Sequence, residues 1–345
     1  MKLFIQIPCL NEAETLPSVI ADLPRQIEGI DEIHTLVIDD GSTDGTLEVA
    51  KAIGVDYIVP NGRHMGLAQS FARGLEACLH LGADVIVNTD GDNQYRGADV
   101  AKLVEPIVTG RADVVVGCRD IDGSVEFPTA KKLLQKLGSR VVRRLSGTTV
   151  PDTTSGFRAL GRKAAAQTAL MNTFSYTLEM LIQLGRSGLK VESVPIEANP
   201  STRPSRLFRS NTQFIWRQMW ILLWTYLFYR PVRFFAWLAT FFFAISVLLS
   251  WRLLYFLYLV DPSQWKFKGG TGTLLLFTSI VTVVCLVSGF LGAVLSGLRL
   301  MLNDLTLRTK NLALEQGVPP LGIEIIRSPE PFAWMRRTGR EADGG

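Results

Sequence analysis

The stretch from residue 84 to residue 94 reads Asp84-Val85-Ile86-Val87-Asn88-Thr89-Asp90-Gly91-Asp92-Asn93-Gln94. Its first half is a short apolar run typical of a buried β-strand, and its second half is an acidic turn where that strand meets solvent. Two carboxylates separated by one small residue, with an amide two positions further on, offer hard oxygen ligands to Mg²⁺ or Mn²⁺. A cation held by Asp90, Asp92 and Gln94 can bridge a diphosphate and neutralise charge on a departing nucleotide.

The pattern on either side of this stretch predicts an α/β fold. Residues 2 to about 120 alternate short β-rich runs, at 3–7, 35–38, 57–59, 85–88 and 113–117, with helical stretches such as 12–23 and 67–81. Such alternation is typical of a mostly parallel sheet covered by helices on both faces. Ligands of these sheets bind outside the carboxyl ends of the strands. We therefore expect the acidic turns after residues 38 and 89 to share one crevice.

Two further polar turns support a functional interpretation. They are Asp-Asp-Gly-Ser-Thr-Asp-Gly-Thr at residues 39–46 and Asp-Thr-Thr-Ser-Gly-Phe-Arg at residues 152–158. In the first turn one carboxylate can accept a hydrogen bond from a nucleobase, and we assign this role to Asp40. A lone acidic turn usually does no more than cap a strand, but three of them favour a binding site.

Charge and cysteine content limit the function classes. The chain has 345 residues and a formal net charge of +4, which suits one large domain with appendages or two domains. Arginines mixed with Trp and Tyr, and without acidic residues, fill residues 203–233. This composition suits a membrane–water interface, whereas a nucleic-acid partner is not expected because the rest of the chain is not basic. The four cysteines have neither metal-site nor disulfide spacing, as in a reducing compartment.

Two apolar stretches predict a membrane hairpin. Residues 234–250 are uncharged and the apolarity continues to about 260, while residues 270–298 contain no charge. Each stretch exceeds the roughly 20 residues that a helix needs to cross a bilayer. We expect interfacial amphipathic helices at 207–232, transmembrane helices at about 233–258 and 272–298 within 233–300, and a tail at 301–345. The near ends carry more Arg and Lys than the loop at 261–269, so both termini are expected on the cytoplasmic side of the cell (inner) membrane.

The motifs together resemble a known family. The set PCLNE at 8–12, DDGSTDGT at 39–46, DGDNQ at 90–94, VGCR at 116–119 and DTTSGFRAL at 152–160 resembles inverting family 2 glycosyltransferases. Within them it is similar to polyprenyl-phosphate glycosyltransferases of the dolichyl-phosphate mannose synthase type. The resemblance covers residues 1 to about 210. It implies a GT-A catalytic domain at 1–206, Rossmann-like with a mostly parallel sheet, before the two-helix transmembrane hairpin.

The same resemblance assigns site residues by position. The metal ligands would be Asp90, Asp92 and Gln94, and the catalytic residues would be Asp92, Arg119 and Asp152. The nucleotide-sugar site would comprise Pro8, Leu10, Glu12, Ile38, Asp40, Asp90, Gly91 and Arg119. The acceptor-phosphate site would comprise Lys131, Gln135, Arg203 and Arg206. Lys131 and Gln135 depart from the Arg and Ser of the family, and a lysine keeps the charge but loses the bidentate fork.

These expectations define one reaction and two rivals. A lipid monophosphate is largely a dianion at pH 7, so it can attack a sugar without a strong base if cations bring the two anions together. We expect one sugar to pass, with inversion and with Mg²⁺ or Mn²⁺, from a UDP- or GDP-sugar to an undecaprenyl- or dolichyl-type phosphate. The bilayer is a further partner, and the membrane helices could support a homo-oligomer. The alternatives are a processive polysaccharide synthase, which two helices and the lack of a Gln-x-x-Arg-Trp motif disfavour, and a non-catalytic scaffold.

Overall fold

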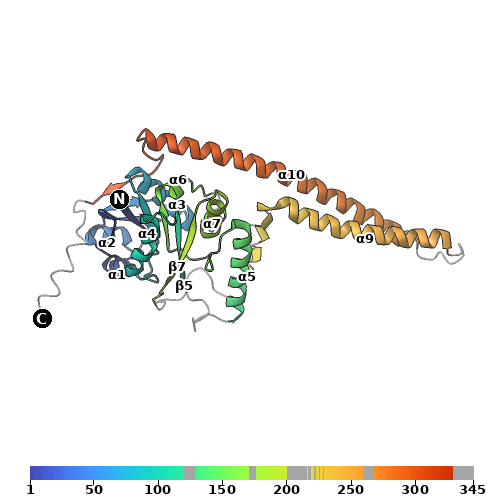
Figure 1. Cartoon of the computed structure of the whole chain (residues 1–345), viewed down its shortest axis with the longest axis horizontal. Coiled ribbons are helices and arrows are strands. Elements are labelled where there is room, and N and C mark those ends of the chain that lie inside the picture. Colours follow the sequence, from blue (N-terminus) through green and yellow to red (C-terminus); the bar gives the residue numbers. More distant parts are fainter. Residues whose placement is uncertain are drawn as a thin grey trace, which may run out of the picture. The chain divides into compact units, whose positions relative to one another are not determined.

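The computed structural model describes residues 1–119, 129–170, 176–199, 229–259 and 268–328, together with residues 216, 219, 220, 223, 224, 226 and 227. The chain divides into two compact units (Figure 1). One unit comprises Met1–Ile215 with Leu305–Gly345, and the other comprises Trp216–Asp304.

An eight-stranded sheet forms the centre of the first unit, with the order β7-β5-β6-β4-β1-β2-β3-β8. The strands are β1 (Lys2–Cys9), β2 (Glu32–Asp39), β3 (Tyr57–Pro60), β4 (Val85–Asn88), β5 (Val114–Arg119), β6 (Arg158–Gly161), β7 (Val191–Ile196) and β8 (Ile326–Arg327). Strands β4, β1, β2 and β3 run parallel, as do β5 and β7, whereas β6 and β8 are antiparallel to their neighbours. The predicted α/β class with a mostly parallel sheet is confirmed.

Helices cover both faces of this sheet (Figure 1). On one face α1 (Leu16–Asp22), α2 (Thr46–Ile53) and α4 (Val100–Val108) contribute to a buried apolar cluster. On the other face α3 (Leu67–His80), α6 (Arg162–Ala166) and α7 (Tyr176–Arg186) contribute to a second cluster. Alternate residues of β1 pack into the two clusters: Leu3 and Ile5 lie in the first and Phe4 in the second. The central strands are therefore mainly apolar, because side chains on both faces are buried.

The loops after the parallel strands lie at one edge of the sheet and are bonded to one another. The backbone N–H of Asn11 donates to Ser42 Oγ at 2.9 Å, and the Thr43 N–H donates to Asn11 Oδ1 at 2.8 Å. The N–H of Glu12 donates to Thr46 Oγ1 at 2.9 Å. Asn11 has a φ of 57°, which asparagine tolerates better than most residues. The first two loops thus form one rigid rim.

The second unit holds two long apolar helices, α9 (Pro231–Leu259) and most of α10 (Lys268–Glu315). Within them Pro231–Tyr258 and Gly270–Glu315 are long and apolar enough to cross a membrane, and their most apolar 18-residue stretches have mean hydropathies of 2.0 and 2.5. Little of either is buried, so these helices are not packed like a soluble core. The hydroxyl of Ser246 donates to Thr278 Oγ1 at 2.8 Å, and a Cβ at Gly292 would lie 2.6 Å from Pro231 Cβ. Small residues therefore let α9 and α10 approach closely.

The last part of α10 and the chain that follows it belong to the first unit. Residues Leu314, Ile323 and Ile325 pack against the apolar cluster beside α3. Strand β8 pairs with β3, and Arg73 of α3 donates through Nη2 to the Gly322 carbonyl at 2.6 Å. We call residues 305–328 the C-terminal arm. Nothing in the sequence pattern of the tail predicts this attachment.

Helix α5 (Thr129–Ser146) completes the described helices of the first unit, together with the short helix η1 (Gly97–Asp99). The predicted interfacial segment at 207–232 lies mostly outside the described residues.

Candidate active site

The acidic turn after β4 is held in place by its neighbours. Thr15 Oγ1 donates to the Gly91 carbonyl at 2.7 Å, and the Gln94 N–H donates to Asp92 Oδ1 at 3.1 Å. From the other side, the Asn199 N–H donates to the Gln94 carbonyl at 2.9 Å. A Cβ at Gly91 would lie 3.0 Å from Cys9 Sγ and 3.2 Å from Glu12 Cγ. The turn is therefore packed directly against the end of β1.

Three carboxylates gather at this turn. Burial raises the pKa of Asp90 to about 7, and the negative charges of Asp92 and Glu12 act in the same direction, while Arg119 opposes them. Like charges that are forced together in this way are stabilised by a cation. The described residues contain no group of three His, Cys, Asp or Glu side chains that would enclose a metal ion. Two carboxylates with an open side nevertheless suit Mg²⁺ or Mn²⁺, because such ions usually take their other ligands from substrate phosphates and water.

Arg119, at the end of β5, is bound to the loop that precedes β6. Its Nε donates to Asp152 Oδ2 at 2.9 Å, and its Nη2 donates to Thr154 Oγ1 at 3.4 Å. Asp152 also accepts from the N–H and the hydroxyl of Thr154, at 3.2 and 2.9 Å. Burial opposes ionisation of Asp152, but the charge and hydrogen bond of Arg119 outweigh it and hold the pKa of this carboxyl below its usual range. Asp152 is thus an anion whose observed partner is Arg119.

The loop from 152 to 157 has a second anchor in Arg158. This side chain is fully buried. It donates to three backbone carbonyls, those of Ser155 at 2.8 Å, Thr177 at 2.7 Å and Thr153 at 2.9 Å. Its observed role is to fix the loop, so that Arg119 and Asp152 meet in a defined position.

Asp40 holds the loop at residues 61–66. Its carboxylate accepts from Asn61 Nδ2, from the N–H groups of Met65 and Gly66, each at 2.9 Å, and from His64 Nδ1 at 2.7 Å. Burial opposes the charge, but these donors outweigh it and lower the pKa of Asp40. The predicted contact between Asp40 and a nucleobase remains a prediction.

The remaining predicted residues fall into two groups. Pro8 and Ile38 are buried in the sheet, and Leu10 is half-buried at the rim. Arg203 and Arg206 lie outside the described residues, as do the side chains of Lys131 and Gln135 on α5. The structure therefore brings Asp90, Asp92, Glu12, Arg119 and Asp152 to one edge of the sheet, and the acceptor-phosphate residues stay predictions.

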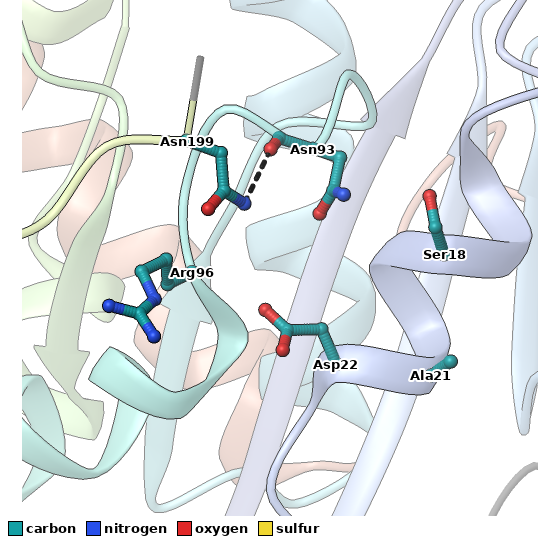
Figure 2. Close-up of a pocket in the computed structure, with 6 residues that line it drawn as sticks. All are labelled: Ser18, Ala21, Asp22, Asn93, Arg96 and Asn199. Carbon is teal, nitrogen blue, oxygen red and sulfur yellow. Dashed lines mark hydrogen bonds between the residues drawn. The ribbon is translucent and has the colours of Figure 1, made fainter.

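A cavity of about 490 Å³ adjoins the acidic turn on the side of α1 (Figure 2). Its lining comprises Ser18, Ala21, Asp22, Asn93, Arg96 and Asn199. In Figure 2 the Asn199 side chain reaches the Asn93 carbonyl, with an Nδ2–O distance of 3.0 Å. None of the predicted site residues lines this cavity, so it does not mark the donor site.

Sequence reasoning missed three polar side chains beneath the acidic turn, those of Asn88, Tyr95 and Tyr176, all of them buried. The one sequence feature that pointed to such buried polar groups was Asn88, an asparagine at the end of the otherwise apolar strand at 85–88.

Comparison with known proteins gives consistent similarities. The family described as glycosyl transferase family 2 matches residues 4–168. Glycosyltransferase AglJ of Haloferax volcanii is 33% identical over 201 residues, which are 57% of this chain and 62% of that protein. A dolichyl-phosphate hexose transferase of the same organism is 31% identical over 186 residues, which are 54% of this chain and 78% of that protein. Glucosyl-3-phosphoglycerate synthase from Mycobacterium tuberculosis, solved with Mn²⁺ and UDP-glucose, aligns with a TM-score of 0.49 at 24% identity, over 65% of this chain and 78% of that one.

Proposed function

The chain belongs to glycosyl transferase family 2, and from this premise we propose that it transfers a single sugar from a UDP- or GDP-sugar to a polyprenyl phosphate. The reaction inverts the anomeric carbon, requires Mg²⁺ or Mn²⁺, and takes place at the cytoplasmic face of the membrane. A relative whose name specifies a dolichyl-phosphate acceptor supports the lipid substrate. The two apolar helices support the membrane location, and they also offer a surface for self-association.

The observation that carries the proposal is the carboxylate turn of Asp90 and Asp92 beside the Arg119–Asp152 pair. When bound at Asp90, Asp92 and Gln94, Mg²⁺ or Mn²⁺ supplies positive charge to the diphosphate leaving group. Glu12 and Gly91 lie at the same turn, where they contribute to the nucleotide-sugar site. Asp152 fixes the Arg119 guanidinium in place, so that it can contact the phosphates without a loss of side-chain freedom during the reaction.

The acceptor needs little activation. A lipid monophosphate is mainly a dianion near neutral pH, so it can attack the anomeric carbon directly. In this proposal Lys131, Gln135, Arg203 and Arg206 bind the acceptor phosphate and offset the repulsion between the two substrates. Asp152 is then a positioning group for Arg119 and not the base.

The test is a donor panel. The full-length protein in detergent is incubated with UDP- and GDP-sugars and a polyprenyl phosphate, with Mn²⁺, Mg²⁺ or excess chelator, and the lipid product is identified by mass. The expected product carries one sugar and disappears with chelator. A polymeric product would indicate a processive synthase, and a protein that neither transfers nor hydrolyses any donor would indicate a scaffold.

A further inference from the structure

The buried amide of Asn88 connects three elements under the acidic turn. Asn88 ends β4, two residues before Asp90, and pairs in register with Gln6 of β1 and Arg158 of β6. Its Oδ1 accepts from Gln6 Nε2 at 3.0 Å. Its Nδ2 donates to the Gly156 carbonyl at 3.0 Å and to Tyr176 Oη at 3.1 Å. Both amide hydrogens therefore have acceptors, and the side chain has one orientation.

Both backbone polar groups of Gly156, the N–H and the carbonyl, are hydrogen-bonded to buried side chains. Its N–H donates to Tyr95 Oη at 3.1 Å, and its carbonyl accepts from Asn88. The Tyr95 ring stacks on Phe157 with the centroids 5.0 Å apart, and the Tyr176 ring stacks on Phe71 at 4.1 Å. We call Asn88, Tyr95, Gly156 and Tyr176 the support cluster.

The carboxylate of Asp90 lies against this cluster. A Cβ added to Gly156 would lie 2.9 Å from Tyr176 Oη, and 3.2 and 3.3 Å from the two carboxylate oxygens of Asp90. The tyrosine hydroxyl and the carboxylate therefore border the same small space above the Cα of Gly156. Glycine is needed here because that space has no room for a side chain.

The hydrogen-bond pattern determines what the Tyr176 hydroxyl can do. The Gly156 carbonyl can only accept, so the group of Asn88 that faces it must be the NH₂. The same NH₂ donates to Tyr176, whose oxygen is therefore the acceptor. In the described part of the chain this is the one hydrogen bond of Tyr176. Its own hydrogen is left for another acceptor, and the Asp90 carboxylate is the anion that borders the same space.

We propose that Tyr176, oriented by Asn88, is a positioning residue that directs its hydroxyl hydrogen to the Asp90 carboxylate and so fixes this ligand for the divalent cation. The inference rests on the proposed function for the presence of that cation. Groups that hydrogen-bond to metal ligands orient them, and their loss commonly weakens metal binding by roughly 10- to 100-fold.

The test measures Mn²⁺ binding directly. The full-length protein in detergent is titrated with Mn²⁺ alone, and free Mn²⁺ is followed by electron paramagnetic resonance. Tyr176→Phe should raise the Kd for Mn²⁺ by about 10-fold. Tyr57→Phe, which removes a hydroxyl from β3 in the same unit, should leave it unchanged. In transfer assays Tyr176→Phe should raise the Mn²⁺ concentration for half-maximal rate, while saturating Mn²⁺ restores most of kcat.

A second variant changes the same hydrogen bond from the side of Asn88. Asn88→Asp keeps the side-chain volume but replaces the donor to Tyr176 with an acceptor, which would draw the hydroxyl away from Asp90. It should also raise the Kd for Mn²⁺. Unchanged Kd values in folded Tyr176→Phe and Asn88→Asp proteins would overturn the inference alone. A wild-type protein that binds no Mn²⁺ would instead overturn the metal dependence in the proposed function, and the inference with it.

Discussion

The Nε of Arg119 lies 2.9 Å from Oδ2 of Asp152, and this ion pair connects the end of β5 with the loop before β6. The Asp152 side chain is fully buried, whereas 22% of the Arg119 side chain is exposed. Asp152 and Thr154 accept hydrogen bonds from Nε and Nη2 of Arg119. The exposed part of the guanidinium is therefore available to the site. The pair converts a flexible side chain into a fixed positive charge.

The first prediction concerns the contribution of this pair to stability. Asp152→Asn leaves Arg119 partly buried without its counter-charge and should lower the free energy of unfolding by about 3 kcal/mol at pH 7. Because the pKa of Asp152 is held below its usual range, the contribution is present above about pH 4 and is lost as the pH falls through the folded-state pKa. The measurement is urea unfolding of both proteins at pH 7 and at pH 3.

The control is Glu105→Gln, which removes a partner of Arg111 from an exposed ion pair. Such pairs contribute at most about 1 kcal/mol. An Asp152→Asn protein as stable as this control at pH 7 would contradict the structural importance of the pair.

The second prediction concerns Asp92. Asp92→Asn removes one negative charge from the proposed metal site and should reduce sugar transfer by roughly 100-fold or more, because charge stabilisation in the transition state is lost. The fold should persist, since the turn keeps its hydrogen bonds to Gly91 and Gln94. Product mass spectrometry and circular dichroism measure the two effects. Asp31→Asn, which changes an exposed carboxylate that pairs with the chain terminus, is the control. Near-normal turnover of Asp92→Asn would refute the metal assignment.

Much of the fold could be predicted because its determinants are local. Strands with both faces buried are continuous apolar runs, and their alternation with helices is visible in the sequence. The antiparallel placement of β6 and the pairing of β8 with β3 are not local. β6 has four residues and β8 has two, so neither has a strong pattern of its own, and their neighbours in the sheet are distant in sequence.

The site was only partly predictable for a related reason. Carboxylates and arginines in turns, such as Asp90 and Arg119, are conspicuous in a motif. Buried partners are not: Tyr176 lies 86 positions after Asp90, and it resembles any aromatic residue of an amphipathic helix. The pairing of Asp152 with Arg119 of β5 also required the structure, because these residues are distant in sequence. Arg158, in the same motif as Asp152, binds backbone carbonyls instead.

The third prediction concerns the loop at residues 61–66. Asp40→Asn replaces one acceptor oxygen with an NH₂ group, which would face donors of the loop. The loop should loosen, and because it adjoins the rim of the proposed donor site, the KM for the nucleotide sugar should rise by about 10-fold with a smaller change in kcat. Trypsin should cleave faster after Arg63, which is exposed. His64→Ala removes only the most exposed donor and serves as the milder comparison. Unchanged proteolysis and KM in Asp40→Asn would show that the loop does not depend on this carboxylate.

The fourth prediction tests the membrane topology. The natural cysteines are buried, so single cysteines can be introduced as reporters. A membrane-impermeant maleimide applied to intact expressing cells should label Ser263→Cys, between the two apolar stretches of the sequence, but not Gln316→Cys, beyond the second one. Both should react after permeabilisation. Labelling of Gln316→Cys in intact cells would place the catalytic unit, together with the positive charges at the near ends of the helices, outside the cytoplasm and would contradict the predicted topology.

The last prediction concerns the C-terminal arm, which joins the catalytic unit although it comes after the apolar stretches in sequence. Ile323 packs beside α3, and the neighbouring Gly322 carbonyl accepts from Arg73. Ile323→Asp places a charge against apolar side chains and should lower the free energy of unfolding by about 2–3 kcal/mol. Leu321→Asp is the matched control, because Leu321 is 99% exposed. Thermal unfolding in detergent should show a lower midpoint for Ile323→Asp alone.

Since β8 covers the edge of β3, release of the arm should also leave that edge open to pairing with other chains. Ile323→Asp should therefore aggregate more readily. Equal midpoints for the two variants would show that the arm is not part of the catalytic unit in solution.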